Sequence, residues 1–313
     1  MLGRTAGGLF WMFRYLERSE NMARLMDAGQ QLALTRRNEA DGEWESILTT
    51  VGAHNGFFER HEEVSAAAVT DYLLRDKTNP TSILSMIGAA RDNARMVRTA
   101  LTREAWEATN ECWIALSDAL ARPVRERDLP DILALVRRLS ALVRGATHGT
   151  MLRNDIYDFA RLGTFLERSD NTARILDVKY YLLLPSASLI GTSIDNMQWE
   201  TILRSVSADR SFHWLNGEQV SSIAIADFLI KDRRLPRSLM FCYATICDNL
   251  QYLADDYGVE LSSHALASAM RERLVRHDIQ QIFDAGLHEF LVEFLSGNAD
   301  LGRRIEQEFR FYE

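Results

Sequence analysis

The sequence predicts an all-α protein: a single helical bundle built from two internal repeats that are related by a pseudo-two-fold axis. First, the motif YLERSENMARLMD at 15–27 recurs at 165–177 as FLERSDNTARILD, with identical Leu, Glu, Arg, Ser, Asn, Ala, Arg and Asp. Second, only five prolines interrupt the 313 residues, which favours long helices over many turns. Third, no stretch shows a convincing alternation of apolar and polar residues that would predict a β-strand.

The first long helix is expected at about 5–35, where apolar residues recur at the spacing of one packed helix face. A second helix begins near Trp44, and its sequence at 44–53, WESILTTVGA, is matched by WETILRSVSA at 199–208. We interpret Trp44 and Trp199 as core anchors, because a tryptophan buries a large apolar area.

A third pair of matching segments precedes another helix in each half. DYLLRDKTNPTSI begins at Asp71 and is matched by DFLIKDRRLPRSL from Asp227. Asn79 is expected to cap the following helix with Pro80 in its first turn, and Leu235-Pro236 to mark the same start in the second copy. The offset between copies drifts from 150 to 155 to 156, so insertions fall between elements, as expected for a duplicated fold.

The remaining helices complete the predicted bundle. They are expected at about 103–120, 129–147 and 153–184, with two or three more after Ser262. No linker rich in Gly, Ser and Pro separates the halves. We therefore predict one domain over residues 1–313, with repeat 1 at about 1–149 and repeat 2 at about 150–313.

The composition excludes several functional classes. The chain carries 36 Lys and Arg against 44 Asp and Glu, a net charge of −8, which argues against nucleic acid as a partner. No run of about 18 apolar residues predicts a membrane span. The three cysteines have no disulfide-framework spacing, so reduced thiols and a cytoplasmic location are expected.

The candidate site is a polar stripe on the repeated motif. On a helix, Arg14, Glu17, Asn21 and Arg24 lie at spacings of three and four residues and so share one face, with Arg18 and Glu20 on either side. The second copy supplies the matching residues Glu167, Arg168, Asn171 and Arg174.

Two interpretations of this stripe remain open, and they can coexist. In the structural interpretation, reciprocal Glu–Arg pairs between the two copies are partly buried and fix the register of the two halves. In the functional interpretation, the arginines hold an anion such as a carboxylate or phosphate, and the glutamates orient them. The structural interpretation is favoured, because structural ion-pair networks are common.

The other candidates are weaker. Asp92-Asn93 and Asp248-Asn249 recur between the copies and could line a cleft, although a solvated face is the simpler interpretation. The seven histidines form no HExxH or Glu-x-x-His pattern, so no metal site is predicted. The chain has no P-loop, GxGxxG or GxSxG pattern, so no cofactor, nucleotide site or hydrolase nucleophile is expected.

Four segments together resemble the bacterial alpha-E family, an all-helical domain named for its repeated Glu-Arg motif. They are MLGRTAGGLFWMFRYLERSENMAR at 1–24, ARDNAR at 90–95, GTFLERSDNTARILDVKY at 163–180 and DRRLPRSL at 232–239. The resemblance covers essentially the whole chain. It departs from the family at Phe13-Arg14, where members usually have Gly-Arg, so the bulkier residue is expected to alter a helix contact.

The resemblance implies a partner and a system, but no catalytic residue. Alpha-E members are typically encoded beside, or fused to, a circularly permuted ATP-grasp protein, often with a transglutaminase-like protease. This context implies an accessory protein that binds a peptide or amino-acid substrate for an ATP-grasp amide ligase, in peptide ligation or peptide tagging. The motif residues that transfer are Glu17, Arg18, Asn21, Arg24, Glu167, Arg168, Asn171 and Arg174.

Two other functions stay open at this point. The chain could be an enzyme in its own right, with Glu17 or Glu167 as general acid or base and an arginine holding a carboxylate. It could also be a structural scaffold, which is favoured if both polar stripes are buried and fully paired.

Overall fold

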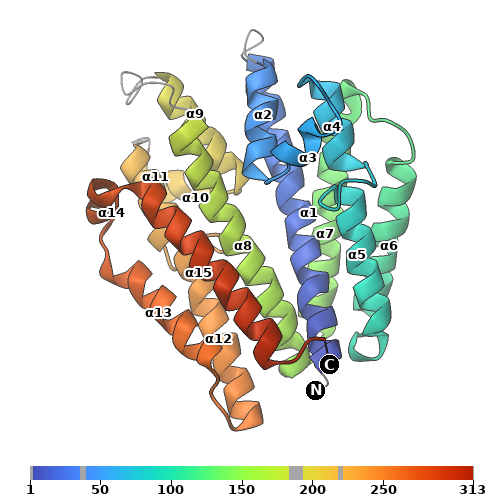
Figure 1. Cartoon of the computed structure of the whole chain (residues 1–313), viewed down its shortest axis with the longest axis vertical. Coiled ribbons are helices and arrows are strands. Elements are labelled where there is room, and N and C mark those ends of the chain that lie inside the picture. The colour runs from blue at the N-terminus through green and yellow to red at the C-terminus, as the bar shows by residue number, and fades with distance from the viewer. Residues whose placement is uncertain (1–2, 36–39, 183–192, 218–220, 313) are drawn as a thin grey trace. The chain divides into compact units, whose positions relative to one another are not determined.

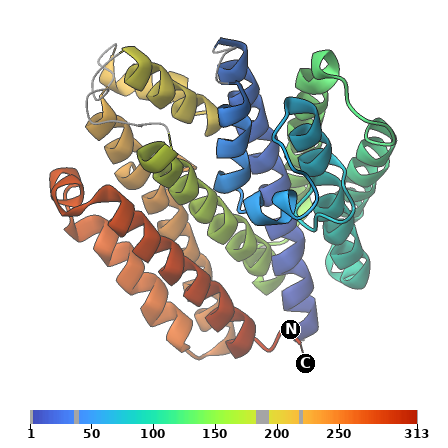
Figure 2. The ribbon, with the colours of Figure 1, turned by 45° about the horizontal axis from the view of Figure 1, so that its top comes forward.

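The computed structural model of the chain describes residues 3–35, 40–182, 193–217 and 221–312. The chain divides into unit 1, residues 1–164 with 310–313, and unit 2, residues 165–309. Every regular element in the described residues is a helix and none is a strand (Figures 1 and 2). The all-α prediction is therefore confirmed, whereas the repeat boundary near residue 149 and the pseudo-two-fold axis stay predictions.

In unit 1, the long helix α1 packs against three of the helices that follow it. In chain order, the elements are α1 (Gly3–Thr35), α2 (Ala40–Thr50), α3 (His54–Phe58), α4 (Ala66–Leu74), α5 (Ile83–Met96), α6 (Arg103–Ala119) and α7 (Leu129–Thr150), with short 3₁₀ turns at Arg98–Ala100 and Glu126–Asp128. Helix α1 packs against α2, α5 and α7, and α6 packs against α5 and α7 (Figure 1).

Unit 2 begins within α8, whose first turns belong to unit 1. Its helices are α8 (Asp155–Leu182), α9 (Ser193–Ser205), α10 (Asp209–Asn216), α11 (Ser222–Lys231), α12 (Leu239–Tyr257), α13 (Ser262–Arg276), α14 (Ile279–Ala285) and α15 (Leu287–Glu308). Helix α12 packs against α11 and α13, and α15 packs against α13 and α14 (Figure 2). Trp44 and Trp199 are each 3% exposed, so the prediction that they are core residues is confirmed.

The beginning of α1 is covered by α8 and by the last residues of unit 1. A Cβ atom on Gly163 would lie 2.2 Å from the carbonyl oxygen of Phe10, so the close approach of these helices requires glycine. The aligned position in the first copy of the motif is Phe13, which is buried. Phe311 is also buried, with its ring centroid 5.3 Å from that of Phe10, and a Cβ on Gly7 would lie 2.8 Å from the Phe311 Cβ.

The helices after the two prolines begin later than the sequence predicts. Helix α5 begins at Ile83 and its N-cap is Ser82, whose Oγ accepts from Ser85 N, so the expectation of an Asn79 cap is wrong. Asn79 instead closes the preceding turn, because its Oδ1 accepts from Thr81 N and its Nδ2 donates to Tyr72 O. The hydroxyl oxygen of Ser82 accepts from an N–H three residues later and so caps the helix, whereas the side-chain amide of Asn79 is already used in the preceding turn.

The second copy starts its helix in the same way. Ser238 is the N-cap of α12, and its Oγ accepts from Phe241 N at 3.0 Å. Both turns also hold an aspartate that accepts from the backbone two residues on: Asp76 from Thr78 N at 2.8 Å and Asp232 from Arg234 N at 2.7 Å.

The described helices follow the same order in the two units. In chain order, α1 to α6 correspond to α8 to α13, and α7 corresponds to α15, with α14 as an additional helix in unit 2. This order places the two copies of the motif on the first long helix of each series.

Candidate functional site

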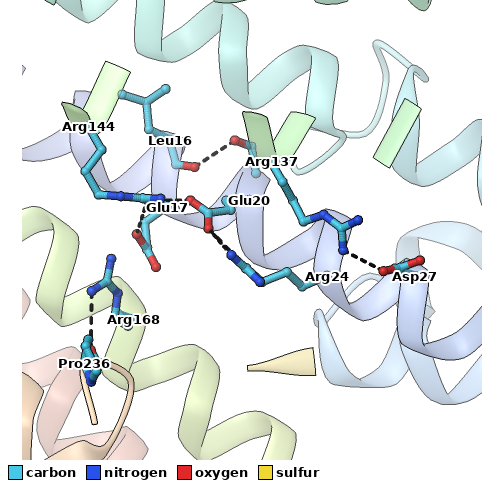
Figure 3. Close-up of polar contacts among 10 residues, drawn as sticks. Leu16, Glu17, Glu20, Arg24, Asp27, Arg137, Arg144, Arg168 and Pro236 are labelled. Carbon is cyan, nitrogen blue, oxygen red and sulfur yellow. Dashed lines mark hydrogen bonds and ion pairs between the residues drawn. The ribbon is translucent and has the colours of Figure 1, made fainter. Parts of the chain in front are cut away.

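The centre of the motif in unit 1 is a pair of buried carboxylates on α1. Glu17 is 3% exposed and Glu20 is fully buried. Arg144 of α7 donates from Nη1 to Glu20 Oε2 at 2.5 Å, and the same nitrogen lies 3.8 Å from Glu17 Oε2. Arg24, one turn along α1, donates from Nη2 and Nε to Glu20 Oε1 at 2.6 and 3.1 Å (Figure 3). Glu20 is therefore held between two guanidinium groups.

A second ion pair joins the same two helices. Arg137 Nη1 of α7 donates to Asp27 Oδ2 of α1 at 2.6 Å (Figure 3). Asp27 lies seven residues after Glu20, and Arg137 lies seven residues before Arg144, so α1 and α7 run antiparallel. We call these two pairs, Glu20–Arg144 and Asp27–Arg137, the α1–α7 ladder.

The other motif residues of unit 1 have different surroundings. The guanidinium of Arg14 lies over the Trp11 ring, 4.7 Å from its centroid, which is cation–π geometry. Arg18 is half-buried, and Asn21 is 2% exposed. The polar stripe predicted from the sequence is thus largely turned inward.

In unit 2, the motif helix α8 binds the turn that precedes α12. Arg168, 7% exposed, donates from Nη1 to the Pro236 carbonyl at 3.3 Å (Figure 3). Thr172 Oγ1 donates to the Arg237 carbonyl at 2.8 Å. Glu167 is 3% exposed, like its counterpart Glu17 in the first copy.

The outer part of the second motif carries one ion pair and one aspartate–histidine contact. Arg174 donates from Nε to Asp170 Oδ2 at 2.7 Å, one turn apart on α8. Asp177, which aligns with Asp27, lies 2.5 Å from His288 Nδ1 of α15. Arg137 contacts the motif aspartate of unit 1, and His288 contacts that of unit 2. Aligning these two residues relates α7 to α15 by a shift of 288 − 137 = 151 residues. Asn171 is half-buried beside these pairs on α8.

A neutral hydrogen-bond network takes the central position in unit 2. Asn298 of α15 donates from Nδ2 to the Leu166 carbonyl at 3.1 Å, and its Oδ1 accepts from Tyr243 at 2.9 Å and lies 3.0 Å from Ser169 Oγ. Burial raises the pKa of Tyr243 well above its ordinary value, so the phenol is a neutral donor. All four residues are buried.

A repeated Glu-Arg pair on helices of an all-α chain is the pattern of a known family. The model of Alpha-E, described as a predicted alpha-helical domain with a conserved ER motif, matches residues 1–309. The chain belongs to the Alpha-E family. In the Alpha-E motif of this chain, the Glu-Arg pairs are Glu17-Arg18 and Glu167-Arg168.

Three relatives of this Alpha-E chain bear names that describe no function. It is 22% identical to an uncharacterized protein of Mycobacterium bovis and to one of Mycobacterium tuberculosis strain CDC 1551, over 94% of this chain. An uncharacterized protein of M. tuberculosis strain H37Rv is 21% identical over the same share. The chain spans only 35% of the length of these relatives. No solved structure matches it.

The sequence located the Alpha-E motif but missed its partners. Arg144 and Arg137 lie 124 and 110 residues from the acids they bind, so no local spacing indicates them. One signal was available, because residues 132–154 contain four arginines and no acidic residue. Glu20, expected only to flank the stripe, is the acid with the most ion-pair contacts in the described network. The pairing of the two copies with each other stays a prediction.

The weaker candidates have contacts of their own on α5 and α12. Asp92 and Asp248 are exposed, whereas Asn93 and Asn249 donate from Nδ2 to the carbonyls four residues earlier on their own helices. The Asn93 carbonyl lies beside Gly8 of α1. Gly8 is nine residues before Glu17, about 13 Å by helical rise.

Other kinds of site find little support in the described part of the chain. Burial raises the pKa of Cys112 to about 12 and also raises that of Cys247, so both remain thiols rather than nucleophilic thiolates. No group of three or more His, Cys, Asp or Glu among these residues could hold a metal ion. No described helix is long and apolar enough to cross a membrane.

Proposed function

We propose that this Alpha-E chain is an accessory protein that binds a peptide or amino-acid substrate for a circularly permuted ATP-grasp amide ligase, in a peptide-ligation or peptide-tagging system. The observation that carries the proposal is the α1–α7 ladder. Its arginines are fixed by carboxylates of α1 and remain partly exposed, at 42% for Arg144 and 30% for Arg137. Arginines fixed in this way are suited to recognising a carboxylate, because little side-chain freedom is lost on binding.

The greater length of the relatives supports the proposal that this chain works beside other domains. The matched region makes up 35% of each of these polypeptides, so there it is joined to a larger remainder. A chain that binds one component of a reaction needs such a neighbour to supply the chemistry. The ATP-grasp protein, implied by family resemblance, is the neighbour that we propose.

Association with that ligase is the direct test. The ATP-grasp protein of the same organism would be immobilised and the purified chain passed over it. We expect binding with a dissociation constant in the micromolar range or tighter, with an unrelated helical protein of similar charge as the control. No association up to about 100 μM would count against the proposal.

The alternative, an enzyme with its own general base, is less well supported. A general base must come within hydrogen-bonding distance of a substrate proton, directly or through one water. Glu17 and Glu167 are each only 3% exposed. Ligation would be reconstituted with the ATP-grasp protein and ATP. A rate loss of about 100-fold or more with Glu17→Gln or Glu167→Gln, in a variant that still binds the ligase, would favour the enzyme over the binding module.

We also propose that the chain arose by internal duplication, with the two motif helices related by a pseudo-two-fold axis. The matching order of helices supports this proposal, as do the serine N-caps Ser82 and Ser238. The aspartates Asp27 and Asp177 each bind a residue of the last long helix in their unit, which supports it further.

A further inference from the structure

We infer that the α1–α7 ladder of unit 1 receives the substrate, and that this substrate is an acidic peptide whose carboxylates lie about 10 Å apart. The inference rests on the proposed function and deepens it, because it names both the surface and the ligand class. The motif itself does not indicate this surface, since both arginines come from α7.

The first argument is the hydrogen-bonding capacity that the ladder retains. Arg144 and Arg137 each donate from Nη1 to an acid of α1. Neither guanidinium makes another hydrogen bond to a described residue, so Nε and Nη2 keep donors for a ligand. By contrast, Arg24 directs Nε and Nη2 to Glu20, and Arg174 directs the same atoms to Asp170.

The second argument is the charge along α7. The chain has a net charge of −8, yet α7 carries three arginines and one histidine against a single acid, Asp131 in its first turn. The acids of α1 that face the ladder, Glu17, Glu20 and Asp27, already lie against its arginines. The acid of α7, Asp131, lies six residues before Arg137, about 9 Å by helical rise, so along the ladder itself an approaching carboxylate meets acids that already lie against arginines.

The third argument is spacing. Seven residues of helix separate the two arginines, which is about 10 Å of rise. A peptide in the polyproline II conformation has three residues per turn and advances about 3.1 Å per residue, so carboxylates on residues i and i+3 lie on one face at about the same separation. A free amino acid or inorganic phosphate would reach only one arginine. Nucleic acid would need a larger basic surface than an acidic chain offers.

Unit 2 lacks the same arrangement. His288 takes the place of Arg137 there, and the shift of 151 residues aligns Arg144 with Leu295. The inference therefore assigns the ligand to one unit, although the motif occurs in both.

Two labelled peptides of equal composition and charge test the inference. The anisotropy of Glu-Ala-Ala-Glu and of Glu-Glu-Ala-Ala would be measured with the full chain, both with blocked termini. We expect the first to bind about tenfold more tightly, because only its side chains reach both arginines. Arg144→Lys should remove that preference, since lysine keeps the charge beside Glu20 but lacks the remaining guanidinium donors. Thermal unfolding would check that this variant is folded.

Arg103→Lys is the matched control, because this arginine of α6 is also in unit 1, is 80% exposed and is paired with an acid. It should leave the preference unchanged. Equal affinity for the two peptides, or a preference that survives Arg144→Lys, would overturn the inference. A chain that captures the ATP-grasp protein but binds neither peptide also overturns it and leaves the proposed function standing. If the chain binds the first peptide with the expected preference but does not capture the ligase, the peptide-binding surface stands and the proposed function fails.

Discussion

The same thirteen-residue motif is stabilised by different chemistry in the two units. In unit 1, the buried Glu20 is held by guanidinium groups of Arg24 and Arg144. In unit 2, a neutral network centred on Asn298 links α8 to α15. The difference teaches that the motif marks where the helix is attached, whereas the partner helix decides whether the centre of the motif is held by an ion pair or by neutral hydrogen bonds.

A shared ion pair within the motif supports this conclusion. Glu20–Arg24 and Asp170–Arg174 are equivalent pairs, each one helical turn apart. The acid side chain is 1% exposed in the first pair and 18% in the second. Because exposed pairs contribute little and buried ones are costly to break, equivalent residues have different energetic weight.

The largest predicted effect is the loss of the ionic attachment. Arg144→Met removes the α7 partner from two buried carboxylates, and we expect the free energy of unfolding to fall by about 3 kcal/mol. Arg24 still compensates Glu20, which keeps the loss at the lower end of the range for a broken buried pair. Urea denaturation followed by circular dichroism measures it.

The aligned residue of unit 2 supplies the control. Leu295→Met exchanges one apolar side chain for another of similar volume and should cost less than about 1.5 kcal/mol. If both substitutions cost the same, the two attachments would not differ as described.

A smaller effect is expected from the neutral network. Asn298→Ala removes the donor to Leu166 O and the acceptor of Tyr243, both buried, and should cost about 2 kcal/mol. Tyr243→Phe removes one hydrogen bond and should cost about 1 kcal/mol. Because these groups are uncharged, neither cost should change between 0.05 and 0.5 M salt, roughly a threefold change in Debye length. A marked salt dependence of either cost would show that the Asn298 network is not the neutral attachment described.

The smallest effect concerns the turn before α12, where the two units resemble each other. A hydrogen bond from Arg234 lowers the pKa of Asp232 against the opposing effect of burial. The ionised carboxylate therefore stabilises the fold above its ordinary pKa of about 3.9, and this contribution is lost as the pH falls through the lower folded-state pKa. Asp232→Asn should remove that acid-dependent loss, about 0.5 kcal/mol after solvent screening.

Asp76 gives the matching measurement in unit 1. Burial raises its pKa, but hydrogen bonds from Thr78 outweigh burial and lower it overall. Asp76→Asn should therefore also make the free energy of unfolding fall less steeply as the pH is lowered. A change in the acid titration for only one of the two variants would contradict the similarity of the two turns, and titrations parallel to that of the wild type for both would contradict the stabilising role of the two carboxylates.

The fold class was predictable from the sequence because helix signals are local. The repeated motif, the scarcity of proline and the apolar periodicity all act within a few turns of one helix. The starts of α5 and α12 were each misplaced by three residues. In α5, for example, Asn79 and Ser82 compete for the same capping role, and only the turn geometry decides between them.

The partners in the site could not be predicted for a different reason. Ion pairs such as Glu20–Arg144 depend on which helix packs against α1, and one sequence contains no direct record of that choice. The motif indicated that polar residues at 17–24 matter, but not that α7 completes the site. The acid-free stretch at 132–154 was the available clue, and it becomes meaningful only beside the acids of α1.

The packing of Phe311 on Phe10 and Gly7 has a consequence for synthesis on the ribosome. Unit 1 is otherwise finished at Thr164, yet the aromatic ring that covers the start of α1 is translated 311 − 164 = 147 residues later. At about 5–20 residues per second, the delay is about 7–30 s. During that time the nascent chain carries an uncovered apolar surface, which a chaperone is suited to shield.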